Sequence, residues 1–149
     1  MRRPAGRGGF TLLEVLVVLA ILVVSAALVL PGLGRGTATL RLRAEARAVV
    51  ALLRQARQLA VSQRRAHTVA LDPLARALLL TRGEGEGTVS RLALGGELRL
   101  RAEEGGTALT FTPRGMAHET VWVLEGPGGR RYRIQVEAVT GRVSMRREA

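Results

Sequence analysis

The sequence predicts an α+β fold in which one long N-terminal helix packs on an antiparallel β-sheet. Residues 10–30 form an almost unbroken apolar run, and helical periodicity returns over residues 39–66. From residue 68 onward, short segments alternate apolar and polar residues with a period of two, and Gly or Pro separates them. The apolar stripe of the helix and one face of the sheet each need a partner, so we expect them to bury one another.

The composition of the chain excludes several classes of protein. Hydrophobic residues make up 47% of the 149 residues, which excludes a disordered protein, and the single long apolar run excludes a multi-span membrane protein. Cysteine is absent, which excludes disulfide frameworks, thiol nucleophiles and cysteine-based metal sites. The 23 basic residues are all arginines and outnumber the 12 acidic residues, so the formal net charge is +11. A charge of this sign favours anionic partners.

The N-terminal part of the chain predicts a single membrane-spanning helix. Residues 1–9 are basic and rich in helix-breaking Gly and Pro. As a helix, the apolar run 10–30 would span about 31 Å, close to the thickness of a bilayer core. Three arginines precede this run, so the positive-inside rule predicts a cytoplasmic N-terminus. Apolar residues continue past the small residues at 25–27, which favours a spanning helix over a secretory signal.

Glu14 is unusual because it lies inside the apolar run. A carboxylate in the middle of a spanning helix costs on the order of 3 kcal/mol, and a position near the helix start reduces that cost. Two interpretations follow. Glu14 is either an interfacial acid favoured by the dipole at the helix N-terminus, or a functional partner for a positive charge.

Residues 8–14 read Gly-Gly-Phe-Thr-Leu-Leu-Glu, and with the basic leader before them they resemble the signature of type IV prepilins. The resemblance implies that a prepilin peptidase removes residues 1–9 by cleavage between Gly9 and Phe10, and that the new Phe10 amine is N-methylated. It also implies that Glu14 pairs with the Phe10 ammonium of a neighbouring subunit during filament assembly. A buried carboxylate requires a cation, and cleavage creates one, so processing would be coupled to assembly.

Residues 31–66 are expected to contain a kinked region followed by an amphipathic helix. Pro31 and the glycines at 32, 34 and 36 would kink the helix or locally remove its helicity. The arginines at 43, 47, 54 and 64 fall mostly off the apolar stripe, and they form either a solvated face or a contact with an anionic surface. The stripe comprises Leu42, Ala46, Val49, Leu53, Ala56 and Ala60.

Residues 67–149 are expected to form a β-rich globular domain. Gly95-Gly96 is interpreted as a hairpin turn between two of its strands. Trp122 and Tyr132 are expected in the core, on adjacent strands. The expected strands cover residues 68–71, 77–81, 89–94, 98–102, 109–112, 120–125, 131–136 and 143–145.

The globular part is similar to the GspH/FimT-like group, through Phe-Thr-Pro-Arg-Gly at residues 111–115, a strand pair, and Thr-Gly-Arg-Val at residues 140–143. That resemblance implies a pilin fold and a structural subunit rather than an enzyme. The implied function is that of a minor pseudopilin of a type II secretion system, and the alternative is a minor type IV pilin in pilus assembly, adhesion or DNA uptake. The implied partners are the peptidase, other pilins or pseudopilins in a filament, and an inner-membrane assembly platform. The domain would then be periplasmic.

A group of C-terminal arginines is a candidate partner surface. It forms either a solvated basic face, a contact for an acidic protein, or a contact for nucleic acid. Some FimT-like pilins are implicated in DNA uptake through a Gly-Arg-x-Arg element, and here Gly141-Arg142-Val143-Ser144 lacks the second arginine, which weakens the DNA interpretation without excluding it. The group comprises Arg130, Arg131, Arg133, Arg142, Arg146 and Arg147.

The sequence offers little to support catalysis. His67 and His118 are the only histidines, and Glu119 is the only acid beside either of them, so we expect no metal site there. Glu84 and Glu86 in a Gly-rich loop would make only a weak calcium site. We therefore expect neither a cofactor nor an enzyme activity, and a membrane-anchored enzyme is the least favoured function.

Overall fold

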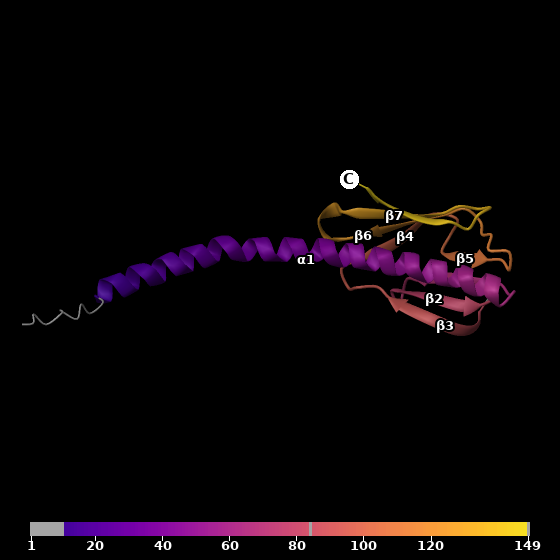
Figure 1. Ribbon diagram of the computed structural model, residues 1–149, viewed down its shortest axis with the longest axis horizontal. Helices are drawn as coiled ribbons and strands as arrows, with labels where there is room; N and C mark the ends of the chain where they lie inside the picture. The colour runs from indigo at the N-terminus through magenta and orange to yellow at the C-terminus, as the bar shows by residue number, and fades with distance from the viewer. Residues whose placement is uncertain (1–10, 84, 149) are drawn as a thin grey trace, which may run out of the picture. The chain divides into compact units, whose positions relative to one another are not determined.

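The computed structural model describes residues 11–83 and 85–148, apart from the side chains of residues 27–37 (Figure 1). The chain divides into two compact units, Met1–Thr37 and Ala38–Ala149. The helix α1 (Leu12–Ser62) begins in the first unit and ends in the second. All eight strands that the structure describes belong to the second unit.

In the first unit, α1 begins directly after Thr11. The backbone N–H of Glu14 donates to the Thr11 hydroxyl at 3.2 Å and to the Thr11 carbonyl oxygen at 3.0 Å. Thr11 is therefore the N-cap, and Glu14 occupies the third helical position, which is the spacing of a capping box. The side chains of residues 11–26 are all exposed in the single chain. No stretch of helix among the described residues reaches the length and hydropathy needed to cross a membrane.

The backbone stays helical across residues 31–36, so of the two expected alternatives, a kink or a loss of helicity, helicity is not lost at Pro31. In a helix, Pro31 costs about 3 kcal/mol and each of the three glycines costs about 1 kcal/mol. A break would also require a second helix to nucleate, at about 4 kcal/mol, and would forfeit the hydrogen bonds across the gap. Continuing one helix is then comparable in cost with starting another.

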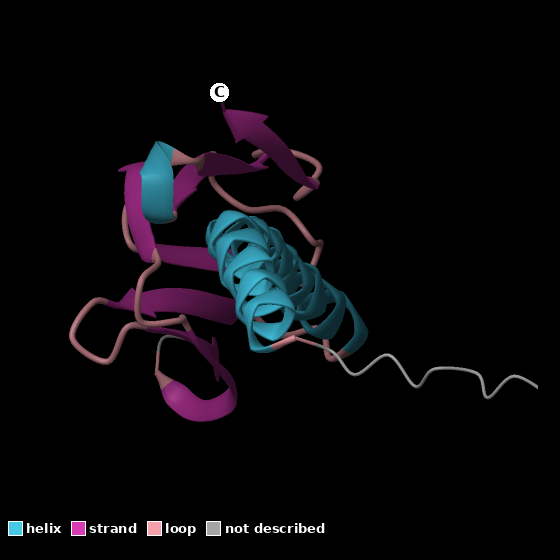
Figure 2. Ribbon diagram, turned by 90° about the vertical axis from the view of Figure 1, so that its left-hand side faces the viewer, coloured by secondary structure: helices cyan, strands magenta, loops and turns pink. Residues whose placement is uncertain are grey.

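The second unit contains two four-stranded antiparallel sheets beside α1 (Figures 1 and 2). The first sheet, ordered β3-β2-β1-β5, comprises β1 (His67–Asp72), β2 (Ala77–Arg82), β3 (Glu86–Ala93) and β5 (Ala108–Phe111). The second sheet, ordered β4-β6-β7-β8, comprises β4 (Arg99–Glu104), β6 (Thr120–Glu125), β7 (Arg131–Val136) and β8 (Val143–Glu148). A short 3₁₀ helix, η1 (Pro127–Gly129), connects β6 to β7.

Two sheets replace the single sheet that the sequence suggested, and the predicted hairpin at Gly95-Gly96 was wrong. Strand β3 pairs with β2, whereas β4 pairs with β6, so the two flanking strands lie in different sheets. The guanidinium of Arg76 donates to the carbonyl oxygens of Gly96 at 2.6 Å and Leu98 at 2.8 Å. Residues 94–98 are therefore a crossover that Arg76 holds in place.

The core lies between the second half of α1 and the two sheets, and it confirms the predicted helix stripe. Every residue of that stripe is buried. The larger cluster joins it to β1, β2 and β5 on one side and to β6, β7 and β8 on the other. A smaller cluster surrounds Leu42 and contains Leu124 and Tyr132. Trp122 and Tyr132 are buried on the paired strands β6 and β7, as predicted.

Candidate functional site

The assembly residues expected at the N-terminus are only partly within the described residues. Gly9 and Phe10 lie outside them. Glu14 is in the first turn of α1 and is exposed. Among the described residues, no ion pair involves its carboxylate. Its backbone amide completes the helix cap, and its carboxylate is available for an external cation.

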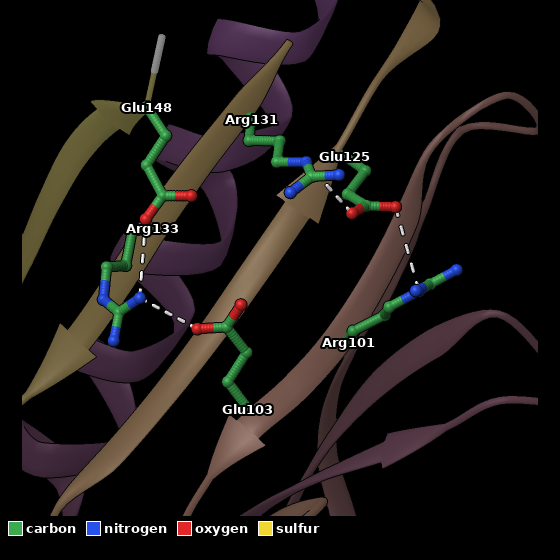
Figure 3. A network of polar contacts seen from close by, with 6 residues as sticks. All are labelled: Arg101, Glu103, Glu125, Arg131, Arg133 and Glu148. Carbon is green, nitrogen blue, oxygen red and sulfur yellow. Dashed lines mark hydrogen bonds and ion pairs between the residues drawn. The ribbon is translucent and has the colours of Figure 1, made fainter. Parts of the chain in front are cut away.

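Two of the predicted C-terminal arginines belong to a network on the face of the second sheet that points away from α1 (Figure 3). Arg131 approaches Glu125 at 3.2 Å, and Arg101 approaches the same carboxylate at 3.8 Å. Arg133 lies 2.8 Å from Glu103 and 3.4 Å from Glu148. We call these six residues the outer-face network.

Arginines of the outer-face network flank an apolar residue of β6, Val123. Val121 and Val123 are buried, although they alternate with Trp122 and Leu124, which face the helix. In the strand registers, Val123 lies between Arg101 and Arg133, so the arginine stems flank it on both sides. Exposed ion pairs of this kind contribute about 0–1 kcal/mol each. The main effect of the network is therefore to make the outer face of the sheet polar, and its contribution to the stability of the sheet is small.

The six predicted arginines do not form one patch. Arg130 donates a hydrogen bond to the Thr39 hydroxyl, on the helix. Arg131 and Arg133 are paired with acids, as described above. Arg146 and Arg147 are exposed on the edge strand β8, where they point to opposite faces because neighbouring residues of a strand alternate. Arg142 lies elsewhere, in a groove beside α1.

This groove has a volume of about 820 Å³ and is lined by four arginines from three parts of the chain. Arg54 and Arg57 come from α1, Arg114 from the loop after β5, and Arg142 from the loop before β8. Val61 and Val143 supply apolar lining between them. We call this feature the arginine groove.

The arginine groove is cationic because no carboxylate neutralises its arginines. In the part of the chain that the structure describes, none of the four lies within 4.0 Å of an acid. Two of them bind backbone carbonyl oxygens instead. Arg57 Nε donates to the Gly115 carbonyl oxygen at 3.2 Å, and Arg54 Nη2 donates to that of Val143 at 3.3 Å. Each bond uses only part of a guanidinium, which carries five N–H donors.

Two glycines allow the loops to approach each other and the helix at the arginine groove. Gly141 has a φ of +60°, and a Cβ there would lie 3.0 Å from Arg57 Nε and far inside contact distance of the Gly115 carbonyl oxygen. Gly115 has a φ of +77°, and its Cβ would lie 3.0 Å from Val61. Both positions therefore require glycine, for backbone conformation and for space.

The arginine groove was not predicted from the sequence. Arg54 was predicted to lie on a helix face and Arg142 on the C-terminal surface, and neither Arg57 nor Arg114 was predicted to be part of a site. The one usable signal is the pair of Gly-containing loops at 113–115 and 140–142, each of which also carries an arginine. Nothing in the residue spacing indicates that these loops meet on α1.

The two histidines occupy separate places. His67 is buried at the start of β1, where its Nδ1 lies 3.0 Å from the Arg65 carbonyl oxygen and its Nε2 has no hydrogen-bond partner among the residues described. His118 is exposed, with Nε2 2.9 Å from the Gly105 carbonyl oxygen. The described residues contain no group of three or more His, Asp or Glu side chains placed to hold a metal ion.

Comparison with solved structures identifies the fold. The type IV minor pilin FimU of Pseudomonas aeruginosa matches with a TM-score of 0.59 and 22% identity, over 70% of this chain and 91% of that one. The minor pseudopilin EpsH of the Vibrio cholerae type 2 secretion system matches with a TM-score of 0.59 and 16% identity, over 70% of this chain and 95% of that one. These likenesses show a pilin fold. No curated protein sequence matches the chain significantly.

Two family models match the sequence. The prokaryotic N-terminal methylation motif matches residues 5–30, which include the Gly9-Phe10 bond and Glu14. The model of type II transport protein GspH matches residues 45–140, which is more than half of the chain and includes most of both sheets. The chain therefore carries the prokaryotic N-terminal methylation motif, has a pilin fold, and belongs to the family of type II transport protein GspH.

Proposed function

We propose that this protein is a minor pseudopilin of a type II secretion system, a structural subunit of a periplasmic filament that drives export of folded proteins. The match of the GspH family model to residues 45–140 carries this proposal. The methylation motif at residues 5–30 supports it, because it is the processing signal expected of a filament subunit. Its family and fold are those of structural subunits, so the protein would act through assembly rather than catalysis.

The helix start supplies the assembly surface in this proposal. A prepilin peptidase would cleave between Gly9 and Phe10, and residues 10–30 would lie in the inner membrane until the subunit enters the filament. Large apolar side chains of this segment are exposed in the single chain, among them Leu12 at 87% and Val23 at 61%. Lipid tails cover such residues as well as a filament core does, so their burial alone gives little drive for leaving the membrane.

Pairing of the Glu14 carboxylate with a cation would therefore favour the assembled state over the subunit in the membrane. Glu14 follows position 10 by four residues in the sequence, and its carboxylate forms no ion pair among the described residues. The Phe10 ammonium of a neighbouring subunit exists only after cleavage, and pairing with it would neutralise both charges in an apolar environment. A displacement along the helix would leave both charges unpaired, so the pair would also set the register between subunits.

Export of proteins from cells tests this proposal. A deletion strain should lose exoproteins from the culture supernatant, and the wild-type chain should restore them. Glu14→Ala should fail to restore export, whereas Glu86→Gln, which removes an exposed carboxylate outside the helix, should restore it fully. An unchanged supernatant in the deletion strain would reject the secretion function.

A minor type IV pilin is the second candidate, and the likeness to FimU, with the same TM-score as EpsH, favours it. In that case the deletion strain should keep normal export and lose surface pili. Counting pili on the deletion strain, with and without the wild-type chain, separates the two functions in one set of strains.

A further inference from the structure

We infer that the arginine groove is a docking site for an acidic polypeptide segment of another protein in the assembly. The inference rests on the proposed function, because a filament subunit needs its globular domain to contact neighbours. It concerns a different part of the molecule from Glu14, and it names the chemistry of the partner: an extended segment with two or more carboxylates.

The two arginine-rich surfaces of the chain differ in whether their arginines have carboxylate partners. On the outer-face network, Arg131 and Arg133 have carboxylate partners within the chain. In the groove, Arg54, Arg57, Arg114 and Arg142 have none among the described residues. Like charges placed together repel one another, and the chain has acids elsewhere that neutralise arginines. The positive charge of the groove is thus available to bind an external anion.

Hydrogen bonds fix the segments of the chain that line the groove, so its shape does not depend on free side chains. Arg57 holds the loop at Gly115, and Arg54 holds the first residue of β8, Val143. The loop before β8 is braced further, since the Thr140 hydroxyl donates to Glu137 at 2.9 Å and accepts from the Arg142 amide at 3.1 Å. A preorganised cationic site loses less entropy when an anion binds.

The length and lining of the groove fit a short extended peptide. Arg54 and Val61 are separated by about 10 Å along the helix, which equals roughly three residues of an extended chain. The valine lining can contact the carbons of a bound segment, and planar guanidinium groups match carboxylates in a bidentate way. A short run of glutamates has the length and the charge that this groove accommodates.

Nucleic acid fits the groove less well. Single strands bind proteins by stacking bases on exposed aromatic rings, and the aromatic residues among those described, Phe111, Trp122 and Tyr132, are all buried. A duplex requires a row of phosphate contacts along an open surface. Arg146 and Arg147 lie on β8 and do not line the groove.

The test is binding of a fluorescein-labelled hexaglutamate peptide to the purified full chain in a non-ionic detergent, measured by fluorescence anisotropy at low and high salt. The wild-type chain should bind, and more weakly at high salt. Arg114→Gln combined with Arg142→Gln should weaken binding by about tenfold, which is about 1.4 kcal/mol. Both residues are exposed, and neither side chain holds a loop, so the fold should be kept.

The matched control is Arg146→Gln combined with Arg147→Gln, which removes the same charge from exposed positions outside the groove. It should bind as wild type. An equal loss in the control would overturn the inference, because binding would then reflect net charge alone. Tighter binding of a DNA oligonucleotide, lost in the groove variant, would overturn it in favour of nucleic acid, and so would full competition by inorganic phosphate, in favour of a small anion. Because the assay uses purified protein, it separates failure at the groove from failure of export in cells.

Discussion

Replacing Gly141 with alanine tests the geometry that brings the two loops onto α1. Alanine at a φ of +60° costs about 1–2 kcal/mol in backbone strain. The added Cβ would also overlap the Gly115 carbonyl oxygen, so the loops must separate, and the hydrogen bond from Arg57 to that oxygen would break. A hydrogen bond to a charged donor contributes about 1.5–3 kcal/mol, and partial exposure puts this one at the lower end. We expect a total loss of about 2.5–3.5 kcal/mol.

The matched control for this substitution is Gly128→Ala. Gly128 has a similar φ of +76°, and a Cβ there would meet nothing within 4 Å. It should lose only the backbone term, about 1–2 kcal/mol. The difference between the two variants isolates the close approach of the loops from the cost of a left-handed residue.

Trp122 provides the assay, because it is the only tryptophan and is 1% exposed, so its fluorescence reports unfolding of the globular domain. Denaturant unfolding of the full chain in detergent should give a lower midpoint for Gly141→Ala than for Gly128→Ala. Equal midpoints for the two variants would refute the placement of Gly141 against Gly115. A loss in Gly128→Ala as large as that expected for Gly141→Ala would refute the energetic reasoning.

Three further substitutions test the core, the crossover and a buried hydrogen bond, and each is followed by denaturant unfolding of the full chain in detergent. Leu53→Ala removes a fully buried side chain and should cost about 2–5 kcal/mol, whereas Leu74→Ala, at a position 96% exposed, should cost less than about 0.5 kcal/mol. Arg76→Ala removes the hydrogen bonds that hold residues 94–98 and should cost about 1–3 kcal/mol; a wild-type midpoint would show that the crossover stands without them. Trp122→Phe removes the indole N–H bond to a backbone carbonyl oxygen at 2.9 Å and should cost about 1–3 kcal/mol, measured by loss of far-ultraviolet circular dichroism; no change would mean that water replaces this bond.

Local periodicity explains why the helix stripe and most strands could be predicted. The predicted strand at residues 131–136 coincides with β7, because Tyr132, Ile134 and Val136 alternate with polar residues and each element carries its own period. The family signature at residues 8–14 is equally local. Both kinds of signal depend only on residues near one another in the sequence.

Pairing between strands and contacts between loops could not be read in the same way. Gly95-Gly96 is as suitable for a crossover as for a hairpin, and the choice depends on β2 and β6, which lie elsewhere in the sequence. Arg54 and Arg142 meet only because both sheets pack on one helix. Helicity is kept at Pro31 for a related reason, since intrinsic helix propensity is a weak guide when a long helix is already nucleated.

The strands at the margins of both sheets are poorly suited to recruit further strands. In the second sheet, β4 carries Arg99 and Arg101 with a bulge after Ala102, and β8 ends in charged residues. In the first sheet, the pairing of β3 is interrupted near Thr81, and β5 has only four residues. Charge, bulges and short length all discourage edge-to-edge aggregation. Crowded copies of this domain can therefore meet through side chains without fusing into a continuous β-structure.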